Sequence, residues 1–394
     1  MTMRWPVVVA LLGLAACSQS ATAVTPTPPV TGQLPSASTA SSASPSAASG
    51  AAEGTAPNPT TLAVMVDLFA GANTYDVSLV SFDARVVARA HARLRTAIPD
   101  ASELPYVSAS NTRVYYLDGD RQIRWLKPDG TTGEAEEVPA GPNVHATFAV
   151  TPDDSRIAVA LLDYSVNPVQ LTLYVEDMGG AHHAVIFSST SHYVWPVAWH
   201  SGQLVVAYLG PTSTPFKSKM FVYSNHDLTS HPYGPNPYGG INFHVINPAT
   251  GQREVIISGG GASGLLTRAG TAVTQGQAVD WSGGQDVFFP DNDYGSVNAV
   301  GSLSPDGKAI AACCDSLAAT GSIVLWYPGG APRTLAANGT SGDWVGWFDN
   351  AHLITGFNQR ADGNPSVVDL NSGSVEPVDV HGIVAAMLPG GLDS

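Results

Sequence analysis

The sequence predicts an all-β fold, a β-propeller built from four-stranded blades. Three observations predict it. A strand–turn–strand pattern recurs along residues 61–390, a second pair of strands precedes most of its copies, and 40 glycines and 29 prolines favour many turns over long helices. Two strands plus two strands make a unit of about 45 residues, which is the period of propeller blades. The sequence therefore predicts about seven blades, with six blades and a long insertion as the alternative.

The more frequent pattern is a β-rich run, a turn containing Gly, Asp, Asn or Pro, and a second β-rich run. Such turn residues accept a positive φ, and the alternation of apolar and polar residues suits half-buried strands. The copies are Val77–Phe82 with Arg85–Val87, Gln122–Trp125 with Pro128–Gly130, Leu171–Val175 with Gly179–Gly180, Phe243–Pro248 with Gly251, Ile323–Trp326 with Gly329–Gly330, and Val367–Leu370 with Gly373. Each copy is expected to supply two strands of a blade.

A second strand pair precedes several of these hairpins. Phe148–Val159, with Thr151-Pro152-Asp153-Asp154 at its turn, matches Ser302–Ala311, with Ser304-Pro305-Asp306-Gly307-Lys308; looser copies are Val197–Trp199 with Leu204–Val206, and Val345–Trp347 with Leu353–Ile354. The segment Ser304–Ala311 resembles the SPDGK-x-[IL]-A motif of TolB-like, WD40-like propellers. The resemblance covers most of the domain and implies a ring of such blades. The Trp-Asp dipeptides that end blades in WD40 proteins are absent from this sequence.

The spacing leaves one blade weak and another divided between the two ends of the domain. Between the hairpins at Leu171 and Ile323 there is room for about three periods but only one clear hairpin, so a degenerate blade is expected around Ala278–Trp281 and Asp286–Phe289. Leu62–Val66 is a second strand without a first, and Gly382–Met387 is a first strand without a second. Pairing the two in one blade would close the ring and remove free sheet edges.

The first residues predict export and lipidation. A charge at Arg4 precedes an apolar run, Val7–Leu14, which has the length of a signal-peptide core and is too short to span a bilayer. Leu14-Ala15-Ala16-Cys17 follows and resembles the lipobox of bacterial lipoproteins. The resemblance implies a signal peptide over residues 1–17, acylation of Cys17, and an extracytoplasmic protein anchored to the cell membrane or the outer membrane. The alternative is an ordinary cleaved signal followed by a chance cysteine.

Residues 18–60 are expected to form a disordered tether. They consist almost entirely of Ser, Ala, Thr, Pro and Gly, which cannot bury enough apolar surface to offset the entropy of ordering. As a flexible coil they would span roughly 35 Å. No later segment has about 18 consecutive apolar residues, so the lipid on Cys17 is the membrane partner that the sequence predicts.

The charge balance argues against nucleic acid as a partner. The formal net charge is -15, whereas binding to phosphate backbones needs basic patches. The same acidic balance disfavours docking on anionic lipid by charge and fits an exported domain kept soluble by mild self-repulsion. A monomer is expected.

Two short motifs have weak functional interpretations. Gly259–Gly264 follows an apolar strand and has the form G-x-G-x-x-G, but the next residues make a poor helix, so a glycine-rich loop between blades is preferred to a dinucleotide site. Asp291-Asn292-Asp293-Tyr294-Gly295 resembles the first half of a calcium loop but lacks its downstream glutamate. Asp291 and Asp293 are therefore weak candidates for a metal ion; no cofactor is otherwise predicted, and calcium stays the alternative to a solvated turn.

Histidines and cysteines point to no local active site. His182 and His183 are expected in a hairpin strand, where their side chains would point to opposite faces, and His145 and His244 could face the central channel or serve as structural side chains. No zinc-protease motif or G-x-S-x-G elbow occurs. Adjacent Cys313 and Cys314 are expected as buried thiols, with a strained vicinal disulfide as the alternative.

The best candidate for binding is the segment from Gly210 to Gly240, an insertion between the second and third strands of the fourth blade. Long loops on rigid scaffolds often carry binding sites, and aromatic side chains suit recognition of protein or glycan. The candidate binding residues in it are Phe216, Tyr223, His231, Tyr233 and Tyr238. The alternative is a decoration that only covers one face of the ring.

Two functions remain open on the sequence. The preferred one is a lipid-anchored scaffold or binding propeller of the cell envelope, whose partner is a protein or glycan. The other is a propeller enzyme, a hydrolase or lyase that could depend on calcium, with a site dispersed over several blades at the channel mouth; the fold alone permits either. Three or more Asp, Glu, Asn or His side chains gathered around the channel would favour the enzyme.

Overall fold

The computed structural model describes residues 61–68, 70–98, 104–211, 240–262, 266–273, 277–287, 301–313, 323–330, 333–335, 344–356 and 365–393. The chain divides into residues 1–55 and 56–394, and every described residue belongs to the second unit. All regular structure in the described ranges is β-strand. Within them there is no helix of the length and hydropathy needed to cross a membrane.

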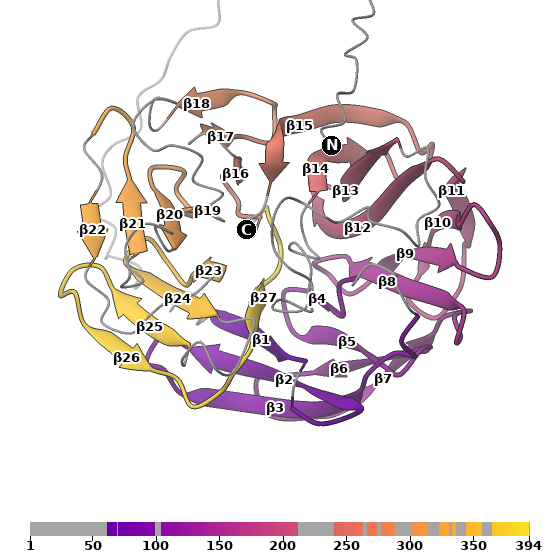
Figure 1. The fold of residues 1–394 in the computed structure, drawn as a ribbon, viewed down its shortest axis with the longest axis horizontal. Coiled ribbons are helices and arrows are strands. Elements are labelled where there is room, and N and C mark those ends of the chain that lie inside the picture. Colours follow the sequence, from indigo (N-terminus) through magenta and orange to yellow (C-terminus); the bar gives the residue numbers. More distant parts are fainter. Residues whose placement is uncertain are drawn as a thin grey trace, which may run out of the picture. The chain divides into compact units, whose positions relative to one another are not determined.

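The described strands form seven antiparallel sheets, each a blade of a β-propeller. Figure 1 shows the sheets standing around a common centre, with the chain passing from one blade to the next. The first strand of each blade lies innermost, and innermost strands of successive blades contact one another, as β27 does β4, β4 does β8 and β8 does β12. The all-β propeller with seven blades, predicted from the repeat, is therefore confirmed.

The blades are numbered in chain order, and their strands run from the innermost outward. Blade 1 holds β27 (Ile383–Leu388), β1 (Leu62–Asp67), β2 (Thr74–Ser81) and β3 (Val86–Arg93); blade 2 holds β4 (Val107–Ala109), β5 (Val114–Asp118), β6 (Gln122–Leu126) and β7 (Thr132–Glu137). Blade 3 holds β8 (Val144–Val150), β9 (Arg156–Asp163), β10 (Gln170–Asp177) and β11 (Ala184–Ser189); blade 4 holds β12 (His192–His200), β13 (Gln203–Pro211), β14 (Gly240–Ile246) and β15 (Arg253–Ala262).

The remaining blades are built from shorter strands. Blade 5 holds β16 (Thr271–Val273), β17 (Gln277–Val279) and β18 (Gln285–Val287); blade 6 holds β19 (Gly301–Leu303), β20 (Ile310–Cys313), β21 (Ile323–Trp326) and β22 (Arg333–Leu335); blade 7 holds β23 (Trp344–Trp347), β24 (His352–Gly356), β25 (Ser366–Asp369) and β26 (Val375–Pro377). Blade 5, three-stranded in the described residues, occupies the position of the degenerate blade that the sequence predicted around Ala278 and Asp286.

The ring closes as the sequence predicted. Strand β1 pairs with β27 on one side and with β2 on the other, so that blade 1 joins the two ends of the domain. Gly382, just before β27, has a φ of 115°, and a Cβ there would lie 2.2 Å from the carbonyl oxygen of Val66. Only glycine allows this approach without a backbone shift.

The Ser-Pro-Asp-Gly motif is the turn between the first and second strands of a blade. In blade 6 the Ser304 hydroxyl donates to Asp306 Oδ1 at 2.7 Å and accepts from the backbone N–H groups of Lys308 and Ala309. In blade 3, Thr151 Oγ1 likewise accepts from the N–H of Arg156. Side-chain oxygens thus satisfy backbone donors in a turn too tight for strand pairing, which explains why the motif recurs at this position.

Tryptophans at the end of two innermost strands fasten neighbouring blades. The buried indole N–H of Trp199 in blade 4 donates to the carbonyl of Ala149 in blade 3 at 3.1 Å. Trp347 in blade 7 repeats the contact with the carbonyl of Ser302 in blade 6 at 3.0 Å. The Val-Ala-Trp and Val-Gly-Trp runs seen in the sequence therefore share a structural role, because each places one indole against the preceding blade.

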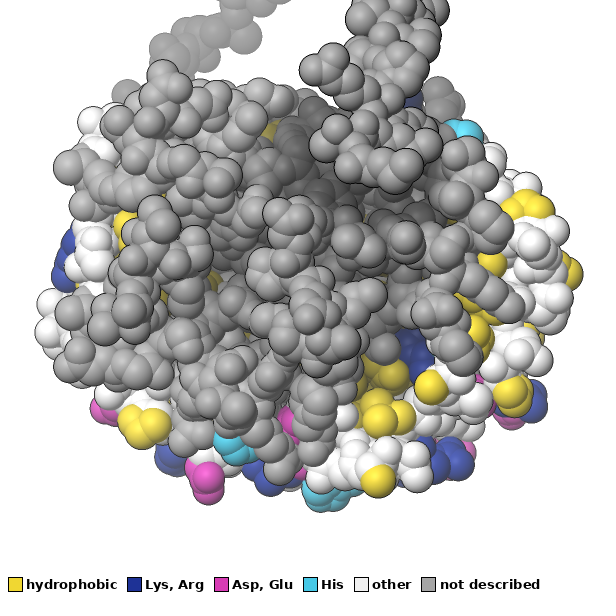
Figure 2. Space-filling model, viewed as in Figure 1, with side chains coloured by type: hydrophobic (Ala, Val, Ile, Leu, Met, Phe, Trp, Pro, Cys, Tyr) yellow, Lys and Arg dark blue, Asp and Glu magenta, His cyan; other side chains and the backbone are white. Residues whose placement is uncertain are grey.

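The outer rim is polar and mixed in charge. Figure 2 shows charged side chains of both signs and histidines along the lower rim, where β3 and β7 lie. Exposed pairs on this rim include Arg85 with Asp83 at 2.6 Å and Arg121 with Glu137 at 2.5 Å. Exposed ion pairs contribute little to stability, so the main effect of these charged side chains is to make the outer strands hydrophilic.

Candidate functional site

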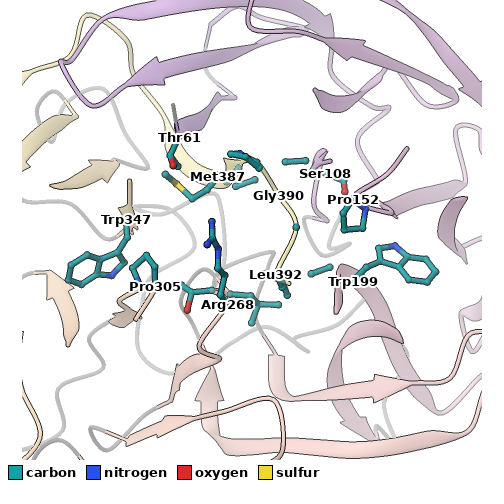
Figure 3. A pocket seen from close by; sticks show the side chains of 18 of the residues that line it. Thr61, Ser108, Pro152, Trp199, Arg268, Pro305, Trp347, Met387, Gly390 and Leu392 are labelled. Atoms are coloured by element: carbon teal, nitrogen blue, oxygen red, sulfur yellow. The ribbon is translucent and has the colours of Figure 1, made fainter. Parts of the chain in front are cut away.

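A pocket of about 280 Å³ lies at one end of the central channel. Its walls are the last residues of innermost strands from several blades, among them Val107–Ala109 of β4, Val197–Trp199 of β12 and Ala385–Met387 of β27. Figure 3 shows one residue of each strand, Ser108, Trp199 and Met387, around a common opening. Such a position is where a propeller brings distant parts of its sequence together, so the pocket is the candidate functional site.

Apolar atoms make up about half of the pocket surface, and polar atoms make up the rest. Leu266, Val197 and Met387 line it with partly exposed side chains, while Trp199 and Trp347 contribute to the wall but are themselves almost entirely buried. The wall can therefore contact an apolar part of a ligand. The two indoles contact the neighbouring blades through the hydrogen bonds described above.

The polar side chains of the described lining are few. The described lining contains one carboxylate, that of Asp349. This carboxylate accepts a hydrogen bond from the backbone N–H of Ala351 and lies 2.9 Å from Nδ1 of His352. The side-chain oxygen of Asn350 accepts from the backbone N–H of Asp306. Arg268 is the cation of this lining, and Figure 3 shows its side chain extending into the middle of the pocket. The described lining therefore combines apolar walls with one basic group that points inward.

The segment after the closing strand lies across the pocket. Residues 389–393, here called the strap, leave β27 and run past blade 2 to blade 4. The backbone N–H of Gly390 donates to the carbonyl of Ser110 at 2.7 Å, and that of Gly391 donates to Asn111 Oδ1 at 3.0 Å. A Cβ on Gly390 would lie 2.1 Å from the carbonyl oxygen of Ala109, so glycine is needed where the strap crosses blade 2.

The far end of the strap is fixed to blade 4. The Asp393 carboxylate accepts from the backbone N–H of Ser201 at 2.8 and 2.7 Å, and its Oδ1 lies 2.7 Å from Nδ1 of His200. The His200 ring stacks on Trp281 of blade 5, with centroids 4.7 Å apart. Leu392 is buried between these anchors and lines the pocket. The strap is thus a built wall of the pocket, held at both ends.

The insertion predicted in blade 4 starts from the opposite end of the channel. In the β12–β13 pair, Trp199 lies opposite Leu204 and His192 lies opposite Pro211. Trp199 lines the pocket, so Pro211, where the connection to β14 begins, is at the other end of the blade. The connection joins the second and third strands of the fourth blade, as predicted.

The chain enters the propeller at the pocket end. Thr61 lines the pocket, and Leu62 at the start of β1 pairs with Leu388 at the end of β27. The connection from β13 to β14 and the entry of the chain therefore lie at opposite ends of the channel.

Most site residues predicted from sequence fall outside the described residues. They are Cys17, the loop residues Phe216, Tyr223, His231, Tyr233 and Tyr238, and the weak metal candidates Asp291 and Asp293. Their roles stay predictions. In the part of the chain that the structure describes, no group of three His, Cys, Asp or Glu side chains could hold a metal ion.

Two histidines considered for the channel are structural. Nε2 of His145 lies 2.9 Å from the carbonyl oxygen of Thr96, and burial together with nearby Arg95 lowers the pKa of His145 to about 4. His244 stacks on Tyr208 at 4.7 Å, and burial followed by the charge of Arg253 lowers its pKa to about 4. Both rings are neutral at physiological pH.

Two predictions of local structure were wrong. His182 and His183 lie in the turn between β10 and β11, not in a strand, and pair with Asp177 and Glu176. Gly259–Ala262 belongs to β15, the outer strand of blade 4, and is not a loop between blades. The expectation that no dinucleotide is bound here stays a prediction.

Sequence reasoning missed the strap and Arg268. Two adjacent glycines after the closing strand were a signal for close backbone approach, but nothing local indicated what they approach. Arg268 sits in the tight turn between Thr267 and Gly270, which pair with each other through both backbone groups. Its inward direction depends on how the blades curve around the channel, which no pattern within its own segment encodes.

No protein-family model and no curated protein matches the sequence of this chain. Similar solved structures include TolB from Acinetobacter baumannii, with 11% identity, a TM-score of 0.38, and 84% of this chain aligned to 65% of that chain. A putative 6-phosphogluconolactonase from Bacteroides fragilis gives 13% identity and a TM-score of 0.47 over 85% of this chain and 99% of that chain. An oligogalacturonate lyase in complex with manganese has 10% identity and a TM-score of 0.34, and the alignment covers 77% of this chain and 70% of that chain.

The chain spans less than two thirds of the length of the TolB structure. At these identities and TM-scores the likeness carries no activity, ligand or location to this chain. The propeller assignment depends on the strand pairing described above.

Proposed function

We propose that this chain is a lipid-anchored binding propeller of the cell envelope, whose partner is a protein or glycan. In this proposal Cys17 carries the lipid, residues 18–60 are the tether, and residues 61–390 form the binding domain. The observation that supports it best is the arrangement of the two ends of the channel. The chain enters at the pocket end through Thr61, and the long connection between Pro211 and Gly240 leaves from the other end.

This arrangement suits presentation of one face away from a membrane. A tether that joins the domain at the pocket end leaves the opposite end free to meet partners in the surrounding space. The connection there carries the aromatic residues Tyr233 and Tyr238, and aromatic side chains bury large area at low entropic cost. The proposed binding face is therefore the end of the ring opposite the pocket.

The composition of the pocket supports binding over catalysis. Among the described lining residues, Asp349 and Asn350 are both held by neighbouring groups, and fewer than three acids, amides or histidines gather there. A dispersed general acid and base would need free titratable groups within hydrogen-bond reach of a substrate.

The test of the anchor is mass spectrometry of the mature N-terminal peptide after expression of the full chain in a bacterium. We expect an acylated Cys17 in the wild type and partition into the detergent phase on phase separation. A Cys17→Ala chain should lose both. An unmodified Cys17 in a membrane-free fraction would refute the anchor.

The test of the binding face uses crosslinking in intact cells. The wild-type chain is compared with a variant in which residues 212–239 are replaced by a short Gly-Ser linker. We expect crosslinked partners with the wild type and their loss with the variant, while both chains keep the same melting temperature. Identical partners in both would place recognition elsewhere, and recovery of none would refute the binding function.

A further inference from the structure

We propose that the channel pocket binds a small anion with an apolar body, held at its charged group by Arg268. The proposal does not depend on the lipid anchor or on the opposite face. It assigns a second site, with its own class of ligand, to the pocket end of the ring.

The first step is the state of Arg268. Its side chain is exposed to the pocket, and no hydrogen bond, ion pair or cation–π contact joins it to another described residue. Most arginines in the described ranges behave differently. Arg93 pairs with Asp118 at 2.9 Å, Arg113 lies 3.4 Å from Asp154, and Arg95 donates to the carbonyl of Ala146 at 3.0 Å. Arg268 therefore brings an unused donor set into the cavity.

The second step is the chain's charge. The protein carries 17 basic and 32 acidic residues, so acidic side chains that could pair with a cation outnumber the cations. Asp349, the acidic residue of the described lining, is instead engaged by His352 and by its own turn. An unneutralised guanidinium between low-dielectric walls attracts anions more strongly than one in open water.

The third step is the shape of the ligand. A guanidinium offers parallel N–H donors that fit a carboxylate or a phosphate in bidentate geometry. Around it, Leu266, Met387 and Leu392 line the pocket with apolar surface. A volume of about 280 Å³ is at the lower limit for small-molecule sites. The fitting ligand is a carboxylate or phosphate monoester on an aryl or alkyl body of few atoms.

The fourth step is the rigidity of the site. The strap wall is fixed by the Gly390 N–H to Ser110 bond and by Asp393 on Ser201. The turn that carries Arg268 is fixed by the paired backbone groups of Thr267 and Gly270. Because hydrogen bonds within the chain fix both walls, binding should need little further ordering of the protein.

The experiment is isothermal titration of the purified full chain with benzoate, phenyl phosphate, benzyl alcohol and inorganic phosphate. We expect benzoate or phenyl phosphate to bind, and benzyl alcohol and inorganic phosphate to bind at least tenfold more weakly. The comparison of benzoate with phenyl phosphate identifies which anionic group the site prefers. Equal binding of benzyl alcohol would overturn the role of the charge, and equal binding of inorganic phosphate would overturn that of the apolar wall.

Variants test the residue itself. Arg268→Gln should weaken the aryl anion at least tenfold, and Arg268→Lys should weaken it less because a charge remains. Arg89→Gln is the matched control, since Arg89 is an exposed arginine on β3, the outer strand of blade 1. Arg268 is in a surface turn, so its variants should melt like the wild type. Undiminished affinity in Arg268→Gln, or no binding of either aryl anion at 10 mM (about -2.7 kcal/mol), would refute the site.

Discussion

Both carboxylate oxygens of Asp393 share the backbone N–H of Ser201, a residue 192 positions earlier in the chain, in one bifurcated hydrogen bond. Asp393 follows the closing strand of blade 1, whereas Ser201 lies in the turn between the first two strands of blade 4. This contact ties together blades that are not neighbours in the ring. It also holds Leu392 in the wall of the pocket.

Asp393→Ala should loosen the strap without unfolding the ring. The lost bonds are charge-assisted but half-exposed, so their removal should cost on the order of 1 kcal/mol. Hydrogen exchange of the Ser201 and Gly390 amides should become about fivefold faster. Asp369→Ala is the control, because Asp369 accepts from Asn371 in its own turn. Unchanged exchange at Gly390 would show that the strap does not need its far anchor.

Ring closure depends on Gly382, and Gly382→Ala should destabilise the whole domain. A methyl group there meets the Val66 carbonyl at 2.2 Å, and the φ of 115° is also unfavourable for alanine. We expect a loss of more than about 2 kcal/mol in denaturant melts. Gly373→Ala is the matched control, since Gly373 has a φ of 75° with open space around it, so that only the backbone cost of about 1–2 kcal/mol remains. Equal losses would mean that closure tolerates displacement of β27.

Removal of the last ten residues, 385–394, tests closure more severely. The deletion takes most of β27 and all of the strap, which leaves β1 with an unpaired edge at the channel. We expect the cooperative thermal transition to shift by tens of degrees or to disappear. Deletion of 389–394 alone removes the strap and spares the strand, and should have a much smaller effect. An unchanged melting temperature after the longer deletion would contradict closure by β27.

The fold could be predicted from the sequence because every blade is built from the same local sequence patterns. Ser304 and Thr151 sit in the same kind of turn, and the hairpins at Val77 and Ile323 need only alternation and a turn residue. Closure could be predicted as well, since Leu62–Val66 and Gly382–Met387 each lacked a partner.

The candidate site could not be predicted in the same way. Arg268, Met387 and Leu392 are far apart in the chain and meet only because the blades curve into a ring. Each looks ordinary within its own segment: one is a turn residue, one is in a strand, and one follows two glycines. The signals that stood out locally, such as the aromatic residues between Gly210 and Gly240, lie outside the described residues.

The contact between blades 2 and 3 should respond to pH through Glu136. This carboxyl on β7 is half-buried beside Glu176 on β10, and burial, the hydrogen bond with Glu176 and its charge raise the pKa of Glu136 to about 7. Tyr174 and His183 also face this group of side chains, and His183 lies 2.8 Å from Glu176.

The direction of the effect follows from the raised pKa. A carboxyl that holds its proton more tightly when folded contributes full stability below its unfolded pKa of about 4.5, and this is lost as the pH rises through about 7. Glu136→Gln should therefore match the wild type at pH 4 and exceed it at pH 8, by on the order of 1 kcal/mol after solvent screening. Urea melts at the two pH values measure this, with Glu134→Gln on the same strand as control. A variant less stable than the wild type at pH 8 would reverse the assignment.

The two tryptophan contacts between blades should have separate and additive effects. Trp199→Phe and Trp347→Phe each keep most of the buried ring but lose the N–H that reaches Ala149 or Ser302. Each should cost about 1–2 kcal/mol in urea melts, because a buried hydrogen bond is lost and a carbonyl loses a partner. Trp125→Phe is the control, since its ring contacts Arg113 and Lys127 by cation–π geometry on the outer side of blade 2. The contacts lie at different blade boundaries, so the double variant should lose the sum of the two costs. If the double variant loses much less stability than that sum, the two contacts are energetically coupled through the ring.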